Sequence, residues 1–122
     1  DQPGPVKVKQ GRLTSMPYSL EMNDVLVYNV NLVSPRRYGD ILKRQFDRLY
    51  AEGEHSGTVM CIPLHPYLVG QPYRLAAFEE ALAYITGHDK VWLATGREIA
   101  HYFNEHYHSA FMAAGHAVGE AP

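Results

Sequence analysis

Apolar residues at helical spacing predict three helices. Residues 35–52 and 72–86 each carry apolar side chains at steps of three and four, and each run begins with proline and is followed by glycine. Ser34 is suited to cap the first of these helices. Residues 95–98, TGRE, fit a capping box, which predicts a third helix that continues to about Ala114.

Short apolar or alternating runs predict the strands. Residues 6–18, VKVKQGRLTSMPY, alternate apolar and polar around a Gln-Gly pair, which indicates a short hairpin with Leu13–Tyr18 as its more persistent strand. Residues 58–64, TVMCIPL, and residues 90–94, KVWLA, are continuous apolar runs typical of strands that are covered on both faces.

Three other segments are predicted to lack regular structure. Residues 1–5 contain two prolines and a glycine and indicate a loop. Residues 19–34 have strand-like residues interrupted by asparagine and aspartate, so we expect an irregular connector with an extended piece. Residues 115–122 are predicted to form a flexible tail.

The order of these elements, strand and helix in alternation, predicts an α/β fold with three βα units and parallel strands. Three parallel strands leave two open edges, and a parallel barrel needs about 250 residues to close. The 122 residues therefore indicate one domain, residues 1–122, that forms about half of a (β/α) barrel.

Composition narrows the function classes. A hydrophobic fraction of 46% with 20% charged residues is typical of a globular chain, and a net charge of −2 without a basic stripe argues against nucleic-acid binding. No run approaches the roughly 18 apolar residues of a membrane span, and no basic-then-apolar leader is present. Cys61 stands alone in an apolar run, so we expect a reducing compartment, the cytoplasm.

His65 ends the apolar run 58–64, where the carboxyl end of a strand is predicted. Reactive side chains of parallel α/β folds gather at these ends, and an imidazole can donate or accept a proton near neutral pH. A histidine that only bonds loop backbone fits this location equally well. Location alone leaves both interpretations open.

Four side chains are predicted to lie near His65. Tyr67 offers a hydroxyl and Arg74 a forked cation for a polar substrate or a carboxylate, although Arg74 also fits a solvated helix surface. Asn23 and Asp24 follow the first strand and would share the rim with His65, where Asn23 is a candidate for binding substrate. Asp24 could accept the ring proton of His65 and fix its tautomer, or it could form an Asx turn.

A metal site is not predicted in this chain. His101, Glu105 and His108 would share one helix face, but the spacing is not a recognised ligand motif and the segment lies away from the predicted rim. A solvated helix face is the simpler interpretation.

Several motifs carry a resemblance to a known family. MCIPLHPYLVGQPYR at 60–74, followed by GHDKVWLATGREIAHYF at 87–103, resembles the carboxyl-terminal half of the polysaccharide deacetylase superfamily. The branch with metal-independent allantoinases is the most similar. MPYSLEMND at 16–24 and FDRLYAEGE at 46–54 fall in the same order as in that branch.

The resemblance implies an irregular, usually seven-stranded (β/α) barrel that hydrolyses C–N bonds of linear or cyclic amides. Leu64-His65 matches the last family motif, which implies that His65 is the general acid that protonates the departing nitrogen. By analogy, Asp24 is implied as the carboxylate that tunes this histidine. The implied substrate is a small amide or an acetylated sugar.

The early family motifs, an aspartate pair and a histidine pair, do not occur in this sequence. In the family they supply the general base and, in some members, metal ligands. We therefore expect the chain to carry no cofactor, to be inactive alone, and to join a complementary amino-terminal-half chain in a hetero- or homo-oligomer, which leaves room for a divalent metal in the complete assembly. The alternative is a non-catalytic half that stabilises a partner chain or binds a small ligand.

Overall fold

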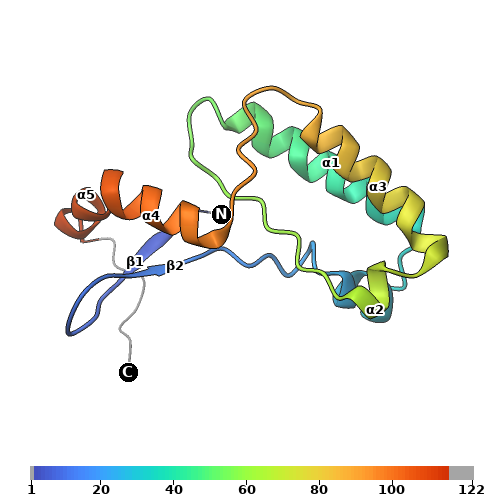
Figure 1. Cartoon of the computed structure of the whole chain (residues 1–122), viewed down its shortest axis with the longest axis horizontal. Helices are drawn as coiled ribbons and strands as arrows, with labels where there is room; N and C mark the ends of the chain where they lie inside the picture. The colour runs from blue at the N-terminus through green and yellow to red at the C-terminus, as the bar shows by residue number, and fades with distance from the viewer. Residues whose placement is uncertain (1, 116–122) are drawn as a thin grey trace. The chain divides into compact units, whose positions relative to one another are not determined.

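The structure, a computed structural model, describes residues 2–115 in two compact units. One unit combines Asp1–Pro17 with Leu93–Pro122, and the other is Tyr18–Trp92 (Figure 1). The tail predicted at 115–122 lies outside the described residues, apart from Gly115. The assignment of residues 1–122 to one domain stays a prediction.

The unit with both chain ends contains the predicted hairpin. Strand β1 (Gly4–Val6) pairs antiparallel with β2 (Leu13–Ser15), and Pro5 lies opposite Thr14. Two predictions are wrong here: the expected loop at 1–5 ends in a strand, and the second strand stops before Tyr18. A two-stranded sheet has only edge strands, and an edge strand tolerates proline.

Two helices complete this unit, α4 (Gly96–His106) and α5 (His108–Ala113). The predicted capping box is present, since the Thr95 hydroxyl accepts a hydrogen bond from the Glu98 amide and the Glu98 carboxylate accepts one from the Thr95 amide. The prediction of a single helix to Ala114 is wrong, because the helix breaks at Tyr107, where φ is −126° and ψ is −23°.

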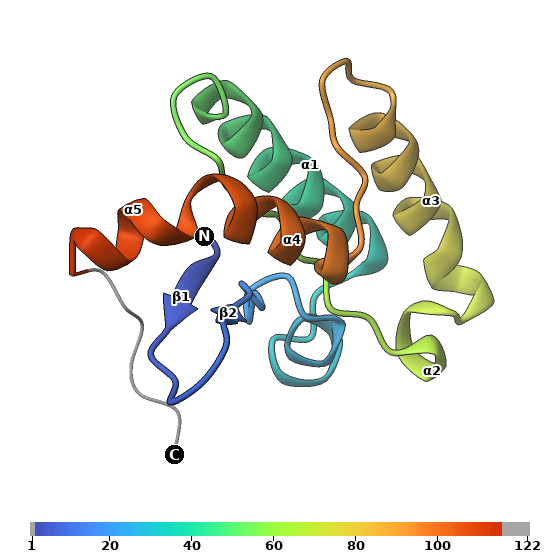
Figure 2. The same cartoon turned by 60° about the vertical axis from the view of Figure 1, so that its left-hand side comes forward.

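The unit Tyr18–Trp92 is built on two long helices, α1 (Pro35–Glu52) and α3 (Pro72–Thr86), which lie side by side (Figures 1 and 2). Both helices begin and end where the sequence predicts. Gly39 allows their close approach, because a Cβ atom there would lie 3.0 Å from the Ala77 carbonyl oxygen.

Two short helical segments lie beside this pair, the π-helix η1 (Leu26–Val30) and α2 (Pro66–Val69). The prediction of an irregular connector with an extended piece at 19–34 is wrong, because η1 forms there and turns two apolar side chains inward. The buried cluster that results contains Met22, Val27, Tyr28, Tyr38, Leu42, Leu68, Val69, Phe78 and Ala81.

The predicted parallel strands are not seen. Within residues 2–115 neither 58–64 nor 90–94 forms a strand, and the hairpin is the sole sheet of that part of the chain. The backbone of residues 59–62 makes no hydrogen bond to the described part of the chain. An apolar run indicates that side chains are buried, whereas a strand also requires a neighbouring strand that supplies backbone hydrogen bonds. The described residues are mainly helical with few strands.

Candidate functional site

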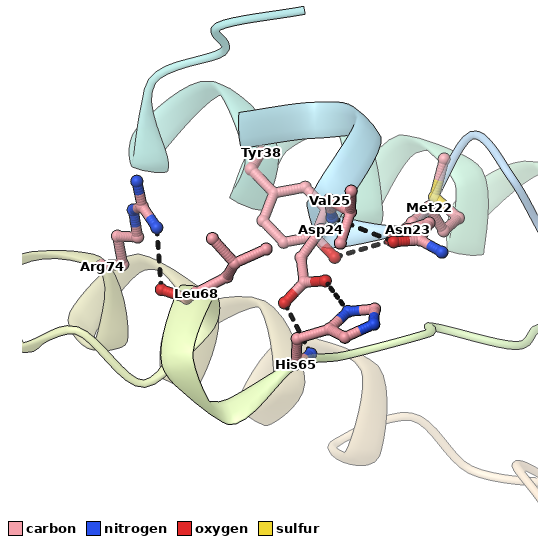
Figure 3. Close-up of polar contacts among 8 residues, drawn as sticks. All are labelled: Met22, Asn23, Asp24, Val25, Tyr38, His65, Leu68 and Arg74. Carbon is pink, nitrogen blue, oxygen red and sulfur yellow. Dashed lines mark hydrogen bonds and ion pairs between the residues drawn. The ribbon is translucent and has the colours of Figure 1, made fainter. Parts of the chain in front are cut away.

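Asp24 and His65 meet in the unit Tyr18–Trp92, although they are far apart in the sequence. The Asp24 Oδ1 atom lies 2.7 Å from His65 Nδ1, and Oδ2 accepts the backbone N–H of His65 at 2.8 Å (Figure 3). Asp24 is fully buried at 0% exposure, whereas the His65 side chain is 36% exposed. One carboxylate therefore holds both the main chain and the ring of His65.

Local structure places each member of this pair. His65 is the residue just before α2, and its carbonyl oxygen accepts hydrogen bonds from the amides of Leu68 and Val69. Asp24 begins the helical turn that leads into η1, and its amide donates to the Pro63 carbonyl at 3.2 Å. The segments that carry Asp24 and His65 are thus joined through main chain and side chain.

An Asx turn forms here, but through Asn23 and not through Asp24. The Asn23 side-chain oxygen accepts the Val25 amide at 2.9 Å, and Asn23 is 8% exposed. This turn leaves the Asp24 carboxylate free to face His65. Asn23 therefore supports the turn from a buried position.

Tyr38, which the sequence did not single out, supports the same turn. Its hydroxyl donates to the Met22 carbonyl at 2.7 Å from helix α1. Burial raises the pKa of Tyr38, and the nearby charge of Asp24 raises it further, so the phenol stays protonated as a donor. No sequence signal marks this role, because a tyrosine on the apolar face of a helix indicates core packing.

The orientation of the His65 ring determines which atom can react. Because Nδ1 faces the Asp24 carboxylate, Nε2 is the ring nitrogen left for other partners (Figure 3). A carboxylate on Nδ1 favours the tautomer with the proton on that atom. The pair can therefore hold, deliver or accept a proton at Nε2.

The other two predicted residues differ in their surroundings. Tyr67 is 64% exposed, and its ring centroid lies 5.8 Å from that of His65 in an edge-to-face arrangement. Arg74 points its guanidinium at the protein, where Nη1 donates to the Leu68 carbonyl at 2.9 Å and the guanidinium carbon lies 4.0 Å from the Tyr28 ring centroid. Tyr67 is open to a ligand beside His65, and Arg74 is engaged internally.

The described residues do not fit a metal centre. No group of three histidine, cysteine, aspartate or glutamate side chains within residues 2–115 could hold an ion. His101 and Glu105 lie on α4, whereas His108 begins α5 beyond the break, so the three do not form one helix face.

No helix in this part of the chain combines the length and apolar character needed to cross a membrane.

Comparisons with known proteins found relatives among the curated proteins and among the solved structures, although no family model matches the chain. A Schizosaccharomyces pombe protein named "Putative polysaccharide deacetylase" is 35% identical over 91 residues, which is 72% of this chain and 28% of that protein. The crystal structure of a "probable Polysaccharide deacetylase" from Pseudomonas aeruginosa superposes with a TM-score of 0.80 at 31% identity, covering 88% of this chain and 37% of that one.

A crystal structure of PuuE allantoinase is similar to the same extent. It superposes with a TM-score of 0.79 at 28% identity over 88% of this chain and 36% of that chain. The chain thus spans between 28% and 37% of the length of these relatives.

Proposed function

Because the chain belongs to the polysaccharide deacetylase superfamily and matches its allantoinase-like branch, we propose that it is the carboxyl-terminal part of a hydrolase of C–N bonds in linear or cyclic amides. In this proposal His65 is the general acid. The contact of 2.7 Å between Asp24 Oδ1 and His65 Nδ1 carries the assignment, because it leaves Nε2 as the proton donor.

The proposed step begins when a water molecule, deprotonated by a general base outside this chain, adds to the amide carbon. The C–N bond then breaks, and Nε2 of His65 gives its proton to the departing nitrogen. An amine leaves poorly as an anion, so this proton lowers the barrier. Asp24 holds the ring through Nδ1 before the transfer and keeps the proton on that atom afterwards.

Tyr67 is our proposed substrate contact, because its exposed ring lies beside His65. A small amide or an acetylated sugar offers the apolar faces and hydroxyls that a tyrosine binds. Asn23 was also predicted to bind substrate. Its burial and its bond within the turn support a positioning role instead.

A complementary amino-terminal-half chain is part of the proposal. Residues 59–62 have unpaired backbone groups within the described structure, and Leu64 is 39% exposed at the end of the same run. Unpaired backbone groups in an apolar run are suited to pairing with a neighbouring strand, so we propose that the partner supplies strands here and completes a (β/α) barrel. The relatives, of which this chain spans about a third, are long enough to include such strands.

The isolated chain is then inactive, because it lacks the general base. The assembly would be a hetero- or homo-oligomer, and any divalent metal would be held by partner residues. The single cysteine, Cys61, is unpaired and partly buried, which favours a cytoplasmic location for the assembly.

The test combines the chain with an amino-terminal portion taken from the Pseudomonas relative, and then follows hydrolysis of allantoin and of N-acetylated sugars. We expect activity only from the pair, and a loss of about 10²- to 10⁴-fold with His65→Gln. His55→Gln, a change at an exposed histidine, should leave activity intact. Equal activity of both variants would overturn the acid role, and a pair that assembles without hydrolysing any amide would favour the non-catalytic alternative.

A further inference from the structure

Arg74 contacts both segments that carry the Asp24–His65 pair. From the first turn of α3 its guanidinium lies over the ring of Tyr28 in η1, with 4.0 Å from the guanidinium carbon to the ring centroid. Its Nη1 donates to the Leu68 carbonyl in α2 at 2.9 Å (Figure 3). Helix η1 follows Asp24 in the sequence, and α2 follows His65.

The contact with Tyr28 continues to the turn before Asp24. The Tyr28 ring packs edge-on against Tyr38 with 5.3 Å between ring centroids, and Tyr38 donates to the Met22 carbonyl. A guanidinium over an aromatic face is attracted by the ring quadrupole, most strongly where water is excluded, and Tyr28 is 6% exposed.

The contact with Leu68 leads to His65 by one further bond. The Leu68 amide donates to the His65 carbonyl at 2.8 Å, so the carbonyl that Arg74 binds belongs to the first turn after His65. Removal of the guanidinium would take away the polar link between this end of α2 and η1, and leave only their apolar packing.

Much of the Arg74 guanidinium is engaged within the protein. Its Nε atom is fully buried and has no hydrogen-bond partner in the described residues, so a ligand from solvent cannot reach that N–H. A second aromatic ring, that of Tyr73, lies 5.0 Å from the guanidinium carbon. The planar fork lies between aromatic rings and a carbonyl, a combination that lysine cannot reproduce.

We infer that Arg74 is a positioning residue that clamps η1 to α2 and thereby holds the Asp24 carboxylate against His65. The catalytic consequence rests on the proposed function. The geometric consequence does not, because the contact between Asp24 and His65 can be observed without turnover.

The experiment records long-range ¹H–¹⁵N spectra of the histidine rings in the chain and in its Arg74→Ala and Arg74→Lys variants, with His65→Gln to assign the signals. In the wild type we expect neutral His65 to carry its proton on Nδ1. Both variants should shift the His65 nitrogens toward an average of the two tautomers. Arg48→Ala, a change at a surface arginine of α1, is the matched control and should leave them unchanged.

A second pair of variants keeps the inference testable if Arg74→Ala does not fold. Tyr28→Phe retains the aromatic face, and Tyr28→Leu removes it at similar hydrophobicity, so only the latter should alter the His65 signals. Unchanged His65 signals in every Arg74 variant that folds, or identical signals in the two Tyr28 variants, would overturn the positioning role. In the active assembly Arg74→Lys should lower kcat more than it raises KM. Unchanged His65 spectra together with lost hydrolysis would overturn the positioning role of Arg74 and leave the proposed function of His65 standing.

Discussion

Asp24 contacts His65 through both carboxylate oxygens, one on the ring nitrogen Nδ1 at 2.7 Å and one on the backbone amide at 2.8 Å. Burial of a carboxylate is costly unless its charge is paired and hydrogen-bonded. Asp24 has 0% exposure and meets this requirement largely through a single residue. Changes at Asp24 should therefore affect the geometry and the proton chemistry of His65 together.

Asp24→Asn tests the charge at nearly constant shape. The amide can accept one of the two hydrogen bonds, but its NH₂ group opposes the other donor and the negative charge is lost. We expect hydrolysis by the assembly to fall by about 10²- to 10⁴-fold. The free energy of unfolding of the chain, measured in urea, should fall by about 1–3 kcal/mol.

The control is Asp47→Asn, a change at an exposed aspartate that accepts the Tyr84 hydroxyl at 2.8 Å. It should leave hydrolysis unchanged. If Asp24→Asn retained wild-type activity, the carboxylate would have no part in the proton chemistry.

The role of His65 as proton donor predicts a dependence on the leaving group. Amides whose departing amine is weakly basic, such as anilides with a nitro group, need little protonation as the C–N bond breaks. For these amides His65→Gln should lower kcat/KM by about 10²-fold or less. For alkyl amides it should lower kcat/KM by about 10⁴-fold. A loss that is equal for both classes in kcat/KM measurements would argue for a binding role.

The environment of Tyr38 predicts a loss of stability at high pH. Burial, then the charge of Asp24 and then Tyr28 raise the pKa of Tyr38 above its ordinary value. The folded state thus favours the neutral phenol, and the contribution to stability is complete below the unfolded pKa of about 10. It is lost as the pH rises from there toward the folded pKa, because the unfolded chain releases the proton first.

Urea unfolding between pH 8 and pH 11 checks this prediction. The unfolding free energy of Tyr38→Phe should fall less steeply above about pH 10 than that of the wild type. Near pH 7 the variant should be less stable by about 1–3 kcal/mol, because the buried Met22 carbonyl loses its donor. Tyr18→Phe, at a residue that is 62% exposed, should match the wild type at every pH, and equal slopes for Tyr38→Phe and wild type would contradict the prediction.

Gly70 fixes the turn between α2 and α3. A Cβ atom there would overlap the Pro66 carbonyl oxygen, so Gly70→Ala must displace α2. We expect a loss of about 1–3 kcal/mol in the unfolding free energy, together with a shift of the His65 ring signals. Gly57→Ala is the matched control, because no atom lies within 4 Å of the Cβ atom that it adds. Equal stability of the two variants would show that α2 adjusts freely.

The helices of this chain were predictable because their signals are local. Ser34 before Pro35 and Gly87 after Thr86 mark helix ends that the structure reproduces, and the capping box at Thr95 forms as expected. The break after His106 and the π-helix at Leu26–Val30 were missed. In the second case asparagine and aspartate indicated a loop, whereas Asn23 in fact supports the turn that leads into the π-helix.

The strands and the site depend on contacts that a pattern does not contain. Residues 58–64 have the composition of a covered strand, but a strand forms only beside another one. Asp24 and His65 are separated by 41 residues. Their expected place on one rim left the pairing as one of two interpretations, and the resemblance to a family favoured it. Nothing in the sequence pattern indicated that Arg74 contacts Tyr28, because two such residues on different helices can meet in many folds.

The backbone of His65 is bonded on both sides, its N–H to the Asp24 carboxylate and its C=O to the amides of Leu68 and Val69. With the main chain fixed and the ring held through Nδ1, few side-chain rotations remain for the substrate to restrict. The entropy of orienting this side chain is lost when the protein folds, once, and does not have to be lost again each time a substrate binds.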